Sequence, residues 1–148
     1  MDNFDAIDIL IVEDNPNDLE LTLRALKSNN LTNRIFSVEN GADALDFFFC
    51  RGKFESRDIQ IPPRVVLLDL KLPKVSGLEV LKIVKSDPQT SFIPIVVITS
   101  SSQDLDVKEA YKLGVNSYVL KPVVFDEFVK AMSNLGFYWL LVNKPLRG

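Results

Sequence analysis

The amino-acid sequence predicts an α/β fold in which five parallel strands form one sheet with helices on both faces. Five short apolar runs alternate along the chain with segments of helical periodicity, and this alternation is typical of parallel sheets with crossover helices. The run at 65–68 is uninterrupted and apolar, which is typical of a strand buried on both faces. Asp69 follows it directly, with turn residues Pro73 and Gly77 soon after. The 148 residues suit one domain.

Composition excludes several classes of function. A hydrophobic content of 47% is ordinary for a globular protein, and a net charge of −3 without a basic run argues against direct nucleic-acid binding. The single cysteine, Cys50, cannot form an intrachain disulfide, which fits a reducing compartment, most simply the cytoplasm. Residues 1–8 do not read as a signal peptide, and no apolar run is long enough to cross a membrane. The absence of histidine excludes acid–base catalysis and metal ligation by an imidazole of this chain.

The first third of the chain predicts two strands and two helices. Residues 7–12 form the first strand, after which Asn15 can cap a helix that has Pro16 at its first position. The apolar face of that helix recurs at helical spacing and consists of Leu19, Leu23 and Leu26. A second strand covers residues 33–38, and Asn40 with Gly41 opens a helix that carries Ala44, Leu45 and Phe48.

Residues 51–63 are polar and contain Gly52 and two prolines, so we expect a surface loop there. After the central strand, Ser76 and Glu79 have the spacing of a capping box, and the buried face of the helix that follows consists of Leu78, Leu81 and Val84. A fourth strand covers 94–98, a helix capped by Ser102 ends at Gly114, and a fifth strand covers 116–120. The last helix runs from about 125 to about 142.

Polar and charged residues follow the apolar strands at the edge where ligands bind in open α/β sheets. In chain order these strand ends are Glu13-Asp14, Asp69, Thr99-Ser100 and Lys121. Three carboxylates at one edge repel one another and favour a hard cation such as Mg²⁺. A carboxylate can attack phosphorus to form an aspartyl phosphate, while a cation, Lys121 and Thr99 stabilise the phosphoryl oxygens. The set is what phosphoryl transfer to Asp69 requires.

Each of these residues taken alone has a simpler explanation. Acidic residues after strands are often loop or capping residues, a Lys-Pro pair is usually a turn, and a Thr-Ser pair often begins a helix. Their joint occurrence at four strand ends in this order favours the chemical interpretation.

These residues resemble the pattern of response-regulator receiver domains. Thr99 and Lys121 follow Asp69 by 30 and 52 residues, as in that family, and the resemblance covers about residues 7–135 of a single domain spanning 1–148. It implies a flavodoxin-like, doubly wound (βα)₅ fold with strand order 2-1-3-4-5. It also implies that Asp69 is the phosphoacceptor. Glu13, Asp14, Asp69 and the backbone carbonyl of Lys71 would hold Mg²⁺ or Mn²⁺.

The resemblance also implies a switch and a partner. Thr99 resembles the switch hydroxyl, Tyr118 the switch aromatic, and Lys121 the lysine that precedes a cis peptide bond to Pro122. The phosphoryl group would come from a histidine kinase and be lost slowly by hydrolysis, so the protein would be a signalling module and not an enzyme. Ser101 stands where other members carry side chains that influence dephosphorylation, so the phosphate lifetime is open.

The loop at 51–63 and the motif from Asp69 to Pro73 look like single-domain regulators paired with cyanobacterial phytochromes, which implies a phytochrome-type kinase as partner. The extended C-terminal segment, about 125–148, is apolar on more than one side. We expect a homodimer through it, and a tail folded back on its own domain is nearly as compatible. The candidate contact residues are Phe137, Tyr138, Trp139 and Leu141. Because no further domain follows in this sequence, we expect the output to be a protein contact.

Two other functions remain open. A metal-dependent phosphohydrolase would also use an aspartyl phosphate, but it would be expected to carry an acid two residues after the nucleophile, where this chain has Lys71. A phosphorylation-independent interaction domain on the same fold is the third interpretation, and the complete set of strand-end residues argues against it.

Overall fold

The computed structural model describes residues 4–27, 34–100, 105–115 and 117–134. Its sheet has five strands in the order β2-β1-β3-β4-β5, and every neighbouring pair is parallel. The predicted fold class and strand order are therefore confirmed. The strands are β1 (Ile9–Val12), β2 (Ile35–Val38), β3 (Val65–Asp69), β4 (Ile95–Thr99) and β5 (Ser117–Leu120).

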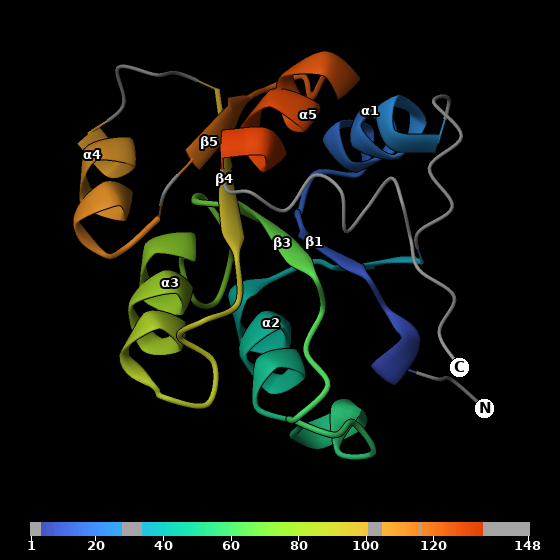
Figure 1. Cartoon of the computed structure of the whole chain (residues 1–148), viewed down its shortest axis with the longest axis vertical. Helices are drawn as coiled ribbons and strands as arrows, with labels where there is room; N and C mark the ends of the chain where they lie inside the picture. The colour runs from blue at the N-terminus through green and yellow to red at the C-terminus, as the bar shows by residue number, and fades with distance from the viewer. Residues whose placement is uncertain (1–3, 28–33, 101–104, 116, 135–148) are drawn as a thin grey trace.

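Helices cover both faces of the sheet (Figure 1). One face packs against α1 (Pro16–Lys27) and α5 (Phe125–Asn134), and the other against α2 (Gly41–Phe48), α3 (Gly77–Ser86) and α4 (Leu105–Lys112). Two short 3-10 helices, η1 (Phe4–Ala6) and η2 (Gly52–Phe54), complete the described elements. No helix in these described ranges is both long and apolar enough to cross a membrane.

The central strands are buried along their whole length, which explains why their sequences are continuous apolar runs. Successive side chains point to opposite faces of the sheet. In β1, Leu10 and Val12 join the core under α2 and α3, whereas Ile9 and Ile11 join the core under α1 and α5. A charged residue that ends such a strand therefore lies at the edge of a well-packed sheet.

The predicted starts of α1, α2 and α3 agree with the structure, whereas Ser102, the predicted cap of the next helix, lies outside the described residues. The Oδ1 atom of Asn15 accepts the backbone N–H groups of Asn17 at 2.9 Å and Asp18 at 3.1 Å, which caps α1. Asn40 and Ser76 cap α2 and α3 in the same way. The buried face of α3 differs slightly from the prediction, since Val80 is fully buried and Leu78 only partly. The segment predicted to extend the last helix beyond α5 lies outside the described residues.

The prediction of a surface loop at 51–63 was wrong for part of that stretch. Phe54 in η2 is fully buried, and its ring makes edge contacts with Phe4, Phe36 and Phe47 at centroid distances of 4.9 to 5.9 Å. Arg57 is also buried; its guanidinium lies over the Phe47 ring and donates hydrogen bonds to the carbonyl oxygens of Phe47 and Ile61. The loop is thus anchored to the core by two side chains.

We expect Phe54→Ala to lower the free energy of unfolding by about 3–5 kcal/mol, because it leaves a cavity among three other aromatic rings. Urea unfolding would measure the loss. Phe92→Ala is the matched control, since Phe92 is 62% exposed and its removal should change stability by less than about 0.5 kcal/mol. Equal effects of the two substitutions would show that the loop is not anchored as described.

Candidate functional site

Three carboxylates gather at the carboxyl edge of the sheet. Glu13 follows β1 and is 1% exposed, and Asp69 ends β3 and is 6% exposed. Asp14 is exposed next to them. One oxygen from each of Glu13, Asp14 and Asp69 lies within 4.8 Å of the others. The neighbouring ends of β1 and β3 in the sheet order bring these residues together from positions 55 residues apart.

Lys121, directly after β5, reaches into this cluster. Its Nζ atom lies 2.8 Å from Oδ2 of Asp69, 2.9 Å from Oε1 of Glu13 and 3.1 Å from Oδ2 of Asp18. The lysine was predicted at this site, but Asp18 was not. Its signal in the sequence was an acidic residue in the first turn of the helix that starts at the same edge.

The turn after β3 fixes the Asp69 carboxylate. Its Oδ1 atom accepts the backbone N–H of Lys71 at 3.1 Å. The N–H of Gly77, at the start of α3, donates to the carbonyl oxygen of Leu70 at 2.8 Å. A Cβ atom on Gly77 would collide with the backbone of Asp69 and Leu70, so only glycine allows α3 to begin this close to the strand end.

Thr99 ends β4 and is 5% exposed. Its carbonyl oxygen accepts the backbone N–H of Lys121 at 2.8 Å, which ties the end of β4 to the residue after β5. The peptide bond between Lys121 and Pro122 is cis. Thr99 and Lys121 thus lie at the same edge of the sheet as the carboxylates.

Tyr118 lies three residues before Lys121, on β5. It is half-buried and packs against the core under α2 and α3. Its ring meets the exposed ring of Tyr111 on α4 edge-on, with centroids 6.2 Å apart. Tyr118 therefore does not share the carboxylate cluster, but belongs to the strand that carries Lys121.

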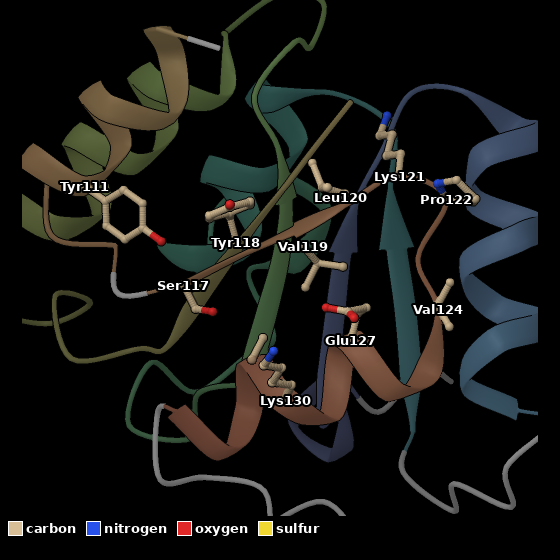
Figure 2. Close-up of a pocket in the computed structure, with 11 residues that line it drawn as sticks. Tyr111, Ser117, Tyr118, Val119, Leu120, Lys121, Pro122, Val124, Glu127 and Lys130 are labelled. Carbon is tan, nitrogen blue, oxygen red and sulfur yellow. The ribbon is translucent and has the colours of Figure 1, made fainter. Parts of the chain in front are cut away.

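A cavity of about 490 Å³ lies along β5 and the start of α5. Figure 2 shows Lys121 at one end of it and Lys130 of α5 at the other, with Tyr111 and Tyr118 on the α4 side. Lys121 therefore belongs both to the carboxylate cluster and to the wall of this cavity.

The surroundings shift the acid–base behaviour of two groups in the cluster. Burial raises the pKa of Glu13 from 4.5 to about 7; Lys121 opposes this shift and Asp69 adds to it. Burial alone would lower the pKa of Lys121, but its contacts with Asp69, Glu13 and Asp18 outweigh burial and raise it. Lys121 is therefore charged at neutral pH, whereas Glu13 holds its proton more tightly than an ordinary glutamate does.

The carboxylates fit a hard divalent cation. The Oε1 atom of Glu13 is buried and makes no hydrogen bond among the described residues, although it lies 2.9 Å from the Lys121 ammonium. Oxygen-only donor sets of this kind suit Mg²⁺ or Mn²⁺. A cation here would satisfy that oxygen and reduce repulsion among the three carboxylates.

Comparisons with known proteins agree with this geometry. The structure of the bacteriophytochrome response regulator RtBRR is 51% identical in sequence to this chain and superposes on it with a TM-score of 0.83. The match spans 95% of this chain and 84% of the RtBRR chain. The probable methanogenesis regulatory protein FilR2 of Methanothrix harundinacea is 39% identical over 95% of this chain and 88% of its own length.

Response regulator Rcp1 of Synechocystis is 34% identical over 89% of this chain and 88% of its own length. The structure of its Mn²⁺-bound form superposes with a TM-score of 0.73, at 33% identity over 95% of this chain and 98% of that one. The model of the response regulator receiver domain family matches residues 9–133. The chain therefore belongs to the response regulator receiver domain family.

Proposed function

We propose that this protein accepts a phosphoryl group on Asp69 from a phosphohistidine of a histidine kinase, in the cytoplasm, and signals through a protein contact that depends on that group. The observation that carries the proposal is the Asp69 carboxylate, held 2.8 Å from the Lys121 ammonium and beside Glu13 and Asp14. A carboxylate flanked by two other carboxylates and an ammonium group is suited to accept a phosphoryl group, which supports this role over a purely structural one.

The chain's own residues supply most of the chemistry. An oxygen of Asp69 forms a bond to phosphorus while the bond between phosphorus and the kinase histidine nitrogen breaks. The Lys121 ammonium offsets negative charge on the phosphoryl oxygens, and the Thr99 hydroxyl donates a hydrogen bond to one of them. The backbone N–H of Lys71 orients the Asp69 carboxylate through its bond to Oδ1.

Glu13, Asp14, Asp69 and the backbone carbonyl of Lys71 would hold Mg²⁺ or Mn²⁺. When bound, the cation neutralises the carboxylates and the charge on the incoming phosphoryl group. Two observations support the carboxylate part of this assignment. The buried Oε1 atom of Glu13 faces the Lys121 ammonium but forms no hydrogen bond among the described residues, and the three carboxylates lie close together.

For the output, we propose that Thr99 and Tyr118 form a two-state element that the phosphoryl group biases. Tyr118 contacts the exposed ring of Tyr111 on α4, so a movement of Tyr118 would change the surface of the protein. The protein would act as a signalling module with slow hydrolysis of its own aspartyl phosphate. Ser101, which bears on that rate, lies outside the described residues.

The input is proposed to be a phytochrome-type kinase, because RtBRR is named a bacteriophytochrome response regulator and is half identical to this chain. FilR2, by contrast, is named a probable methanogenesis regulatory protein. We also propose a single receiver domain over 1–148 that forms a homodimer. The contact residues predicted for it, Phe137, Tyr138, Trp139 and Leu141, lie outside the described residues.

We expect the wild type to incorporate label from acetyl phosphate when Mg²⁺ is present, and Asp69→Asn to incorporate none. The asparagine keeps the shape of the side chain but cannot form an acyl phosphate. Intact-protein mass spectrometry would count the phosphoryl groups, and circular dichroism would check folding.

Asp126→Asn is the matched control, since Asp126 is an exposed carboxylate in the first turn of α5. It should be labelled like the wild type. Label on folded Asp69→Asn would refute the assignment of the phosphoacceptor. A folded wild type that takes no label with Mg²⁺ would favour a phosphorylation-independent interaction domain.

The raised pKa of Glu13 predicts a pH-dependent stability. Between pH 4.5 and about 7 the folded, metal-free protein holds a proton that the unfolded chain has released, so its stability falls as pH rises through this window and stays low above it. Glu13→Gln should remove this loss and stabilise the metal-free protein at pH 8 by ~2 kcal/mol. Urea unfolding with a chelator, at several pH values, would measure it.

Glu109→Gln, on the exposed face of α4, is the control for loss of one negative charge and should keep the wild-type pH dependence. Mg²⁺ should stabilise the wild type more than Glu13→Gln at pH 8, because a ligand is lost. An unchanged pH slope in Glu13→Gln would contradict the burial argument.

A further inference from the structure

We propose that Asp18 is a positioning residue that holds the Lys121 ammonium over Asp69 and thereby speeds phosphoryl acceptance. The inference rests on the proposed function and adds a residue to it. Oδ2 of Asp18 accepts a hydrogen bond from Nζ of Lys121 at 3.1 Å. The two residues are 103 positions apart, so the contact joins the first turn of α1 to the end of β5.

The chain fixes Asp18 in place through its own backbone. Oε2 of Glu13 accepts the backbone N–H of Asn15 at 3.2 Å, and Oδ1 of Asn15 accepts the N–H of Asp18 at 3.1 Å. The end of β1, the cap and the first turn of α1 therefore form one connected unit. Asp18 presents its carboxylate to Lys121 from this unit.

Asp18 differs from the other two partners of Lys121. Glu13 and Asp69 belong to the group of carboxylates that fits a cation, and among the described residues Asp18 does not. An ammonium group has three N–H donors, and here three carboxylates surround it at 2.8 to 3.1 Å. When Glu13 and Asp69 bind a cation or a phosphoryl group, Asp18 can still accept a hydrogen bond from the Lys121 amine.

This hold matters because lysine has a flexible four-carbon stem. The Lys121 side chain is 18% exposed and that of Asp18 is 36% exposed, so water competes for the amine at the open side of the site. With Asp18 in place, one donor stays fixed and the donor now on Asp69 can turn to the phosphoryl oxygen that forms there. Without it, the amine samples orientations that do not face Asp69.

A purely electrostatic role for Asp18 makes the opposite prediction. Removal of one negative charge would attract an anionic phosphodonor and would raise the rate at low donor concentration. Loss of positioning lowers the maximal rate at saturating donor instead. Glu20 separates the two effects, because it lies on the same helix, is exposed, and pairs with Arg24 and not with Lys121.

The experiment measures phosphorylation by acetyl phosphate with saturating Mg²⁺, over a range of donor concentrations, in wild type, Asp18→Ala, Asp18→Asn and Glu20→Ala. We expect Asp18→Ala to lower the maximal rate about tenfold. Asp18→Asn should recover part of the rate, because its amide oxygen still accepts a hydrogen bond. Glu20→Ala should match the wild type at saturation.

A second measurement distinguishes positioning from a general effect on α1. In a Lys121→Gln background, Asp18→Ala should change the remaining rate by less than about twofold, because the amine that it positions is gone. A tenfold loss in that background would overturn the proposal, as would equal maximal rates in Asp18→Ala and Glu20→Ala. If the folded wild type takes no label, the proposed function fails and this inference fails with it; a labelled wild type with an unaffected Asp18→Ala refutes the inference alone.

Discussion

The site depends on one ammonium group that several carboxylates share. Lys121 lies within 3.1 Å of Asp69, Glu13 and Asp18, and Asp14 adds a further negative charge close by. One positive charge cannot balance so many negative ones, so the unliganded site keeps an excess of negative charge at a partly buried position. In the proposed function, that excess would raise the affinity of the edge for a cation and, through the cation, for a phosphoryl group.

Much of this arrangement could be predicted from the sequence, because residues that directly follow the strands of a parallel sheet all lie at the same edge of that sheet. Apolar runs fix the strands, parallel strands share a carboxyl edge, and Glu13, Asp69 and Lys121 follow such runs directly. Asp18 escaped prediction because it lies on a helix, where a charged first-turn residue is explained equally well by the helix dipole. Only the packing of α1 against the sheet brings it to Lys121.

The stretch at 51–63 could not be judged from its average polarity. Phe54, Arg57 and Pro63 are buried, while most of their neighbours stay at the surface. Burial of a guanidinium is costly and lowers the pKa of Arg57, so a sequence rule counts arginine as exposed. Here the guanidinium is stabilised by the face of the Phe47 ring and by hydrogen bonds to two backbone carbonyl oxygens. Such compensation comes from tertiary structure and leaves no pattern along the chain.

Strand β5 links the charged site to the surface. Lys121 follows it and touches Asp69, while Tyr118 on the same strand meets Tyr111 of α4, and both tyrosines line the cavity beside α5 (Figure 2). The backbone bond from Lys121 to the carbonyl of Thr99 ties this strand end to β4. If the Lys121 ammonium changes its contacts, the change therefore occurs next to the wall of this cavity. In the proposed function, a phosphoryl group that redirects Lys121 and Thr99 would act on the joined ends of β4 and β5, directly beside the cavity that Lys121 and Tyr118 line.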